Sequence, residues 1–218
     1  MENYLKSTFF LDYETEEVKS KVTELTKNLE NDKEKAVKLF YFVRDTIQYN
    51  PYSPWDKREY YKSSEILKRG FGYCIQKAIL LCSMLRCTKI PCKLIFVDIK
   101  NYNAPEKLTK LFGDTYHYHG YCGIRLNNKW VAAAPTFNIE MCKKFGYTPT
   151  EFNGDKDALL EKYNANNELT FDYVKPRGEF DDFPFDLVMD GYKRELGMEV
   201  FEKWTSYVNK LNLKNSKG

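Results

Sequence analysis

The sequence lacks several features that would assign it to common classes of protein. Its 34 basic and 31 acidic residues leave a net charge of only +3 and form no basic block, so we expect no nucleic-acid partner. The longest apolar stretches, "AILLCSML" and "LIFVDI", are too short to span a bilayer, so we expect no membrane partner. The N-terminus has no basic region followed by an apolar run, which predicts a cytoplasmic protein with reduced cysteines.

Histidine is also scarce, and the cysteines are poorly spaced for a metal. The four cysteines between residues 74 and 92 are separated by seven, four and four residues, so they form neither a zinc knuckle nor a Cys-x-x-Cys redox pair. The only histidines, His117 and His119, would share one face of a strand, where Cys122 points to the other face. A metal enzyme using both histidines and Cys74 is a third-ranked alternative. We predict no metal and no cofactor.

What is present is typical of a globular α+β protein. Hydrophobic residues make up 43% of the chain, and helical spacing recurs over residues 14–29, 33–47 and 74–87. The segment "IPCKLIFVDI" predicts a buried strand, and residues 117–126 and 129–134 predict a hairpin around "NNK". Helices followed by a strand meander indicate an α+β fold. The order predicts an N-terminal helical segment (1–32), a core (33–138) and a C-terminal extension packing on it (139–218), which ends in a helix over 185–211.

Cys74 differs from the other cysteines because it opens the most apolar helix. Its sulfur is expected to lie beside unpaired backbone N–H groups at the positive end of the helix dipole, which would lower the thiol pKa. Gly70 and Gly72 allow a tight turn just before it. The remaining five cysteines are interpreted as small buried hydrophobic residues. We therefore predict that Cys74 is a nucleophile.

A nucleophilic thiol needs a base, and the two histidines are the available choices. Both lie on the predicted hairpin that would pack against the Cys74 helix. Alternate residues of a strand share a face, so spacing alone does not choose between His117 and His119.

Two segments resemble the transglutaminase-like superfamily. In "GFGYCIQKAILLCSMLRCTKIPCKL" a Gly-x-Cys opens the central helix and an Arg precedes an Ile-Pro turn. In "HGYCGIRLNNKWVAAAPTFN" a His opens a strand, and a Trp and a Pro-Thr follow. The resemblance covers about residues 33–138 and implies a papain-like cysteine-enzyme core, with a nucleophile-bearing helix packed on an antiparallel sheet. It assigns catalytic roles to Cys74 and His119 and thus selects His119 over His117.

One position departs from the family pattern, because Ala134 stands where the triad Asp is usual. Alanine cannot accept a hydrogen bond from the imidazole, so it cannot fix the tautomer or stabilise imidazolium. We consider Asn138, Thr136 and Asp114 as side chains that would orient His119 instead. A catalytically impaired fold that binds peptides or proteins is the alternative function that Ala134 suggests.

The expected chemistry is acyl transfer from an amide or peptide bond through a Cys–His thiolate–imidazolium pair and a thioester. The backbone N–H of Cys74, with Tyr49, Tyr52 or Trp55 from the preceding loop, is the expected oxyanion hole. Hydrolysis is favoured over cross-linking because water is always available. The expected partner is a peptide, protein or small amide substrate.

Overall fold

The computed structural model describes residues 1–215, which form eight α-helices and six strands. The helices are α1 (Glu16–Thr26), α2 (Asp32–Tyr41), α3 (Ser63–Arg69), α4 (Cys74–Cys87), α5 (Glu106–Phe112), α6 (Ile139–Phe145), α7 (Phe185–Leu196) and α8 (Met198–Asn215). The strands are β1 (Gln48–Tyr49), β2 (Phe71–Gly72), β3 (Cys92–Asn101), β4 (Thr115–Leu126), β5 (Lys129–Ala133) and β6 (Phe171–Phe180). Short 3-10 helices span Glu2–Leu5 and Arg58–Tyr61, and a π-helical turn, Phe42–Thr46, continues α2.

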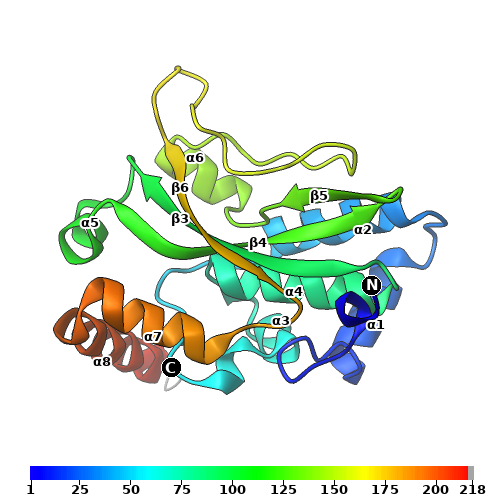
Figure 1. The fold of residues 1–218 in the computed structure, drawn as a ribbon, viewed down its shortest axis with the longest axis horizontal. Helices are drawn as coiled ribbons and strands as arrows, with labels where there is room; N and C mark the ends of the chain where they lie inside the picture. Colours follow the sequence, from blue (N-terminus) through cyan, green and yellow to red (C-terminus); the bar gives the residue numbers. More distant parts are fainter. Residues whose placement is uncertain (216–218) are drawn as a thin grey trace.

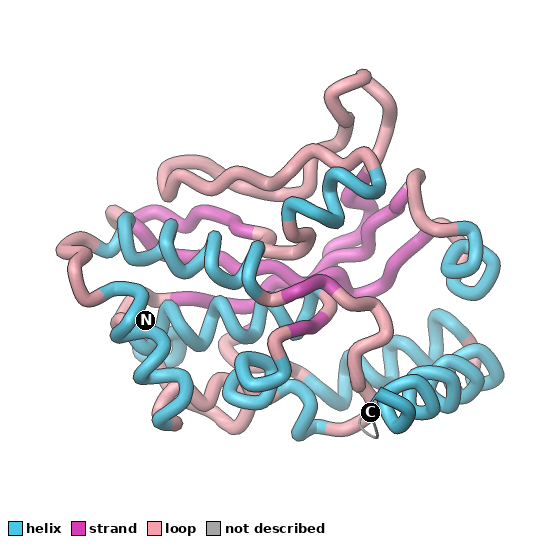
Figure 2. Tube along the Cα trace, turned by 180° about the vertical axis from the view of Figure 1, so that it is seen from behind, coloured by secondary structure: helices cyan, strands magenta, loops and turns pink. Residues whose placement is uncertain are grey.

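An antiparallel sheet with the order β5-β4-β3-β6 is the centre of the molecule, and β1 and β2 form a separate parallel pair. Helices α1, α3, α4, α7 and α8 gather on one side of this sheet, and α5 lies beyond the ends of β3 and β4 (Figure 1). The long loops of residues 146–170 run along the other side together with α6 (Figure 1, Figure 2). The α+β prediction is confirmed. The boundaries between the three predicted segments stay predictions.

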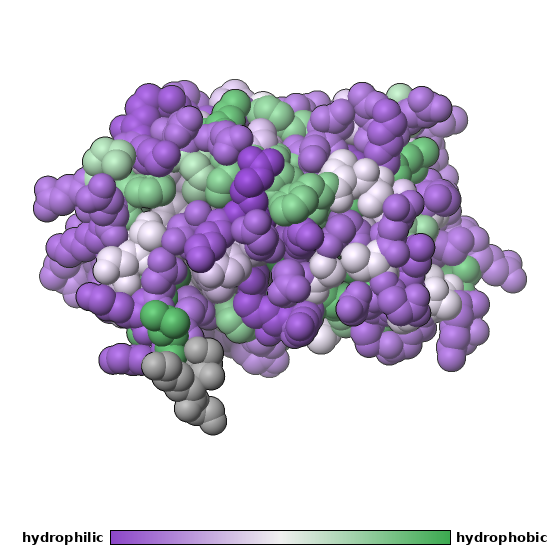
Figure 3. All heavy atoms as spheres, turned by 90° about the horizontal axis from the view of Figure 1, so that it is seen from below, coloured by the Kyte–Doolittle hydropathy of each residue, from purple (hydrophilic) through white to green (hydrophobic). Residues whose placement is uncertain are grey.

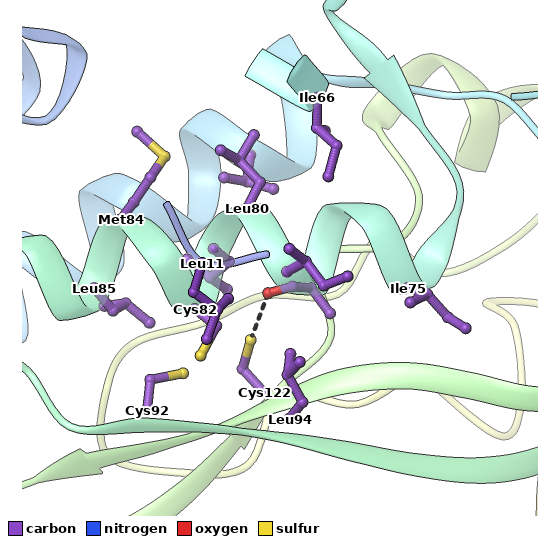
Figure 4. Packing of buried hydrophobic residues seen from close by; sticks show 14 of the residues in the cluster. Leu11, Ile66, Ile75, Leu80, Cys82, Met84, Leu85, Cys92, Leu94 and Cys122 are labelled. Carbon is purple, nitrogen blue, oxygen red and sulfur yellow. Dashed lines mark hydrogen bonds between the residues drawn. The ribbon is translucent and has the colours of Figure 1, made fainter. Parts of the chain in front are cut away.

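Helix α4 is the buried centre of the helical layer, as its apolar circumference predicts. Every residue from Ile75 to Arg86 is buried, and the helix packs along β4. Cys82, Cys92 and Cys122 meet between α4 and the sheet, where the Cys122 thiol donates to the Ala78 carbonyl at 3.2 Å (Figure 4). These cysteines and Cys142 are buried as expected, whereas Cys87 is partly exposed.

The two ends of α3 are held by a distant carboxylate and by a glycine. Lys62 precedes the helix without a capping side chain. Asp12 takes that role from a distant segment, because its carboxylate accepts from the Ser64 N–H at 2.9 Å and from the hydroxyls of Ser63 and Ser64. Gly70 ends α3 in the left-handed region, with φ of 74°.

The region after residue 139 contains the largest structural error of the sequence prediction. No strand was predicted after residue 134, yet the segment "KPRGEF" belongs to β6, which pairs with β3 over Phe171–Phe180. Pro176 and Gly178 are tolerated because β6 is the outermost strand of the sheet and its register shifts twice.

The predicted C-terminal helix is also two helices, because Gly197 at φ of 79° separates α7 from α8. These two helices lie next to α5, where Phe112 packs on Trp204 with ring centroids 4.9 Å apart (Figure 1). Their outer surface belongs to a mostly hydrophilic face with small, separated apolar patches (Figure 3). The apolar sides of α7 and α8 therefore face inward, toward the site described next.

Candidate active site

A cavity of about 360 Å³ contains the two residues that were predicted to be catalytic. Cys74 and His119 both line it, together with His117 and Thr136. Much of the wall is aromatic and comes from distant parts of the chain: Tyr49 and Trp55 near β1, Phe112 of α5, Phe137 after β5, Tyr192 of α7 and Trp204 of α8. The C-terminal helices therefore help to enclose the site, and no carboxylate side chain lines its wall.

Cys74 is the first residue of α4 and lies against β4. Gly120 makes this approach possible, because a Cβ at that position would stand only 3.1 Å from the Ile75 Cα. The backbone N–H groups of Gly120, Ile75 and Cys74 favour the thiolate form of the sulfur. The adjacent residue of β4 is His119, the predicted base, which lines the same cavity as Cys74 at the start of α4.

Burial reverses the expected direction of the Cys74 pKa. Burial in the apolar cavity raises the pKa of the thiol to about 11, and the three N–H groups oppose this shift without cancelling it. The helix end therefore has the predicted geometry, but desolvation outweighs it. The resting side chain is a neutral thiol, so the prediction of a lowered thiol pKa was wrong.

Burial also favours the neutral form of His119. Its side chain is buried, with 2% of the residue exposed, and burial lowers its pKa to about 3. Tyr173 packs edge-on against the imidazole at a centroid distance of 6.0 Å, and the buried Nε2 has no hydrogen-bond partner within residues 1–215. The resting pair is thus thiol and neutral imidazole, instead of the expected thiolate and imidazolium.

The family pattern has an Asp at position 134, and the Ala134 found there explains why Nε2 of His119 lacks an acceptor. Ala133 pairs with Cys122 on the face toward α4, so Ala134 lies on the opposite face, which His119 shares. Ala134 is fully buried and offers no side-chain acceptor.

None of the three side chains considered as substitutes hydrogen-bonds to His119. Asn138 bonds to Gln48, Glu140 and the Tyr49 N–H. Asp114 lies outside the cavity wall and pairs with Lys100 at 2.9 Å. Thr136 shares the cavity with His119, but its buried hydroxyl has no partner.

The three side chains suggested for the oxyanion hole all line the cavity. Tyr49 packs against Phe137 at 4.7 Å, and Tyr52 packs against Trp204 at 5.4 Å, which are ordinary aromatic contacts. Trp55 differs from them, since its indole N–H is buried without an acceptor. Gln76 of α4 holds the adjoining loop by donating to the Pro54 carbonyl at 2.8 Å.

Unpartnered polar atoms are concentrated at this cavity. Among the described residues, five buried side-chain polar atoms lack a partner, and four of them belong to cavity-lining residues: Trp55, Tyr116, His119 and Thr136. A buried polar group without a partner costs about 1–3 kcal/mol. A ligand that supplies partners for these groups would recover this cost.

A β-bulge separates the two histidines. Between Val97 and Ile99 one residue of β3 stands opposite two of β4, and Tyr118 has φ of 56°. His117 consequently bonds to Asp98, with 3.0 Å between Nδ1 and Oδ2, whereas His119 has no such partner. Tyr118 packs against α7 so closely that a Cβ on Gly191 would stand 2.3 Å from its ring.

Asp98 and Arg177 are the polar residues that sequence reasoning missed. Arg177 of β6 binds Asp98 through two nitrogens, at 2.8 and 2.5 Å. The available signal was Asp98 itself, a charged residue within the otherwise apolar strand "LIFVDI". Within residues 1–215, no group of three His, Cys, Asp or Glu side chains is arranged to hold a metal ion. No helix in the same range has both the length and the apolar character needed to cross a bilayer.

The sequence pattern of the transglutaminase-like superfamily matches residues 19–135. No curated protein matches the chain. Among solved structures, a candidate cysteine protease from Cytophaga hutchinsonii is 9% identical, with a TM-score of 0.48; the alignment covers 81% of this chain and 52% of that protein. A candidate protease from Parabacteroides distasonis is 14% identical, with a TM-score of 0.41, and the alignment covers 61% and 25%. The chain thus spans about half the length of the first of these structures, and less of the second.

Proposed function

Because the chain belongs to the transglutaminase-like superfamily, we propose that it is a cysteine-dependent acyl-transfer enzyme that hydrolyses an amide or peptide bond. The observation that carries this proposal is the geometry of Cys74 and His119. They line one cavity, and the backbone N–H of Gly120, the residue after His119, favours the thiolate form of Cys74.

The neutral resting pair indicates general-base activation. His119 takes the thiol proton as the sulfur attacks the carbonyl carbon, so the two charges form together and stabilise each other. The Cys74 N–H and the unpartnered indole N–H of Trp55 are the candidate donors to the developing oxyanion.

Collapse of the tetrahedral intermediate completes the first half of the reaction. The imidazolium returns its proton to the leaving amine as the carbon–nitrogen bond breaks, which leaves the acyl group on sulfur as a thioester. Water then releases the acid and regenerates the thiol. Water is the expected acceptor because it is always available, whereas an amine would need a binding site of its own.

Ala134 supports a second candidate, a binding module on the same fold. A site in which burial raises the pKa of Cys74 and lowers that of His119 is poorly prepared for catalysis without a further charge. In this case the aromatic cavity would bind an apolar peptide segment without reacting with it.

The two candidates are separated by reaction with p-nitrophenyl 3-phenylpropionate, whose apolar acyl group suits an aromatic wall. We expect a burst of p-nitrophenolate and a mass increase of one acyl group on Cys74. Cys74→Ala should abolish both, whereas Cys87→Ala, which removes the other partly exposed thiol, should change neither. Binding of the ester without acylation would favour the binding module.

A further inference from the structure

We propose that His117, held by Asp98, is a second acid–base group of this cavity and activates the water that releases the acyl group. This inference rests on the proposed function, since it concerns the second half of that reaction. It starts from the hydrogen bond between His117 Nδ1 and Asp98 Oδ2, at 3.0 Å, on a residue that lines the same cavity as Cys74.

Asp98 is fixed from three sides, so the imidazole it holds has a defined orientation. Its Oδ1 accepts from the Tyr118 N–H at 3.1 Å, and both oxygens accept from Arg177. Asp98 is only 2% exposed. An imidazole whose Nδ1–H donates to a carboxylate has its other nitrogen free to act as a base.

Both negative and positive side chains surround His117. The groups facing it are Asp98 from β3, Arg177 from β6 and Glu195 from α7, with Arg177 and Glu195 2.8 Å apart. Burial alone would raise the Asp98 pKa, but the hydrogen bonds from Arg177 and His117 lower it overall. Asp98 therefore stays ionised and can stabilise a proton on His117.

Exposure indicates which half of the reaction His117 serves. The His117 side chain is 16% exposed, whereas the His119 residue as a whole is 2% exposed, so His117 is the more accessible imidazole for incoming water. His117 Nε2 takes a proton from water as the oxygen bonds to the thioester carbon. The carbon–sulfur bond then breaks, and the imidazolium proton passes to the Cys74 sulfur, which restores the neutral thiol and the neutral imidazole.

The experiment uses p-nitrophenyl 3-phenylpropionate, because p-nitrophenolate leaves without needing a proton. The burst reports acylation, and the steady rate after it reports release of the acyl group. In His117→Asn the side-chain amide keeps an N–H near the position of Nδ1 but has no base. We expect an unchanged burst, a steady rate about 100-fold lower, and acyl-enzyme accumulation by intact mass. Free imidazole should restore part of the steady rate.

Asp98→Asn tests the positioning role of the carboxylate. This variant should also lower the steady rate more than the burst, and its rate should depend on pH differently, because the carboxylate no longer stabilises imidazolium. His117→Asn keeps the proposal testable if Asp98→Asn does not fold. An unchanged steady rate in His117→Asn, or an equal loss of burst and steady rate, would overturn the inference. Failure of the wild type to acylate would instead refute the proposed function.

Discussion

His117 and His119 are two residues apart on β4, yet they occupy opposite electrostatic environments. His117 bonds to an ionised, buried carboxylate and reaches solvent. His119 is enclosed by aromatic rings, and its Nε2 has no partner. The single inserted residue at the bulge makes this difference, because a regular strand would place both imidazoles on one face.

The comparison shows how one strand can divide the tasks of a catalytic triad. His119, the imidazole that the family register assigns to catalysis, has no acid partner among the described residues. His117, two residues before it on β4, bonds to Asp98 and is the more exposed of the two. The contrast can be tested through the reactivity of Cys74, through residue 134 and through the pH dependence of stability.

The largest expected effect is the pH dependence of Cys74 alkylation, which tests whether Cys74 and His119 are neutral. With a thiol pKa of about 11, alkylation of Cys74 by iodoacetamide should accelerate about tenfold per pH unit from pH 7 to 10, because the thiolate fraction rises at that rate. Mass mapping of the labelled cysteine gives the rate at each pH. A rate that is already high at pH 6 and flat above it would mean that Cys74 and His119 form an ion pair.

A carboxylate at position 134 should give His119 an acid partner, as Asp98 is for His117. In Ala134→Asp the new acceptor for Nε2 should raise the His119 pKa and allow a thiolate–imidazolium pair. We expect alkylation of Cys74 at pH 7 to be about tenfold faster, with a weaker dependence on pH. Ala134→Asn is the matched control because it has nearly the same shape without the charge. Equal rates in the two variants would contradict the proposed relation between residues 134 and 119.

The smallest expected effect is on stability. The His119 pKa of about 3 lies below the ordinary value of 6.5, so the unfolded state binds more protons between these pH values. The stability that neutral His119 contributes is complete above pH 6.5 and is lost as the pH falls. Urea denaturation should show a loss of about 2 kcal/mol from this group between pH 8 and pH 5. His119→Gln should lack this loss, and His117→Asn should retain it; the same pH dependence in both variants would contradict the assignment.

Local patterns predicted much of the fold. The bounds of α4 match the expected 74–87 because its apolar residues and the preceding glycines act locally. The hairpin formed at Asn127 and Asn128, which both have positive φ. Strand β6 was missed because its proline and glycine are acceptable only at a sheet edge, and edge position depends on the partner strand.

The site was predictable in position but less so in electrostatics. Family motifs and the helix end led to Cys74 and His119, and both line the cavity. The pKa directions depend on rings contributed by distant segments, such as Tyr192 and Trp204, which the sequence near Cys74 does not reveal. The bond between His117 and Asp98 depends on a bulge, and neither strand shows that inserted residue when it is considered alone.

The positions of the two histidines on β4 depend on Gly191, a residue outside the cavity wall. Helix α7 is seated directly on the Tyr118 ring, and any larger residue at 191 would push the ring away. Because Tyr118 lies between His117 and His119 in the chain, we expect a displaced ring to shift the part of β4 that carries both imidazoles. A small residue at position 191 of α7 is thus required for the positions of His117 and His119, which lie more than 70 residues earlier in the chain.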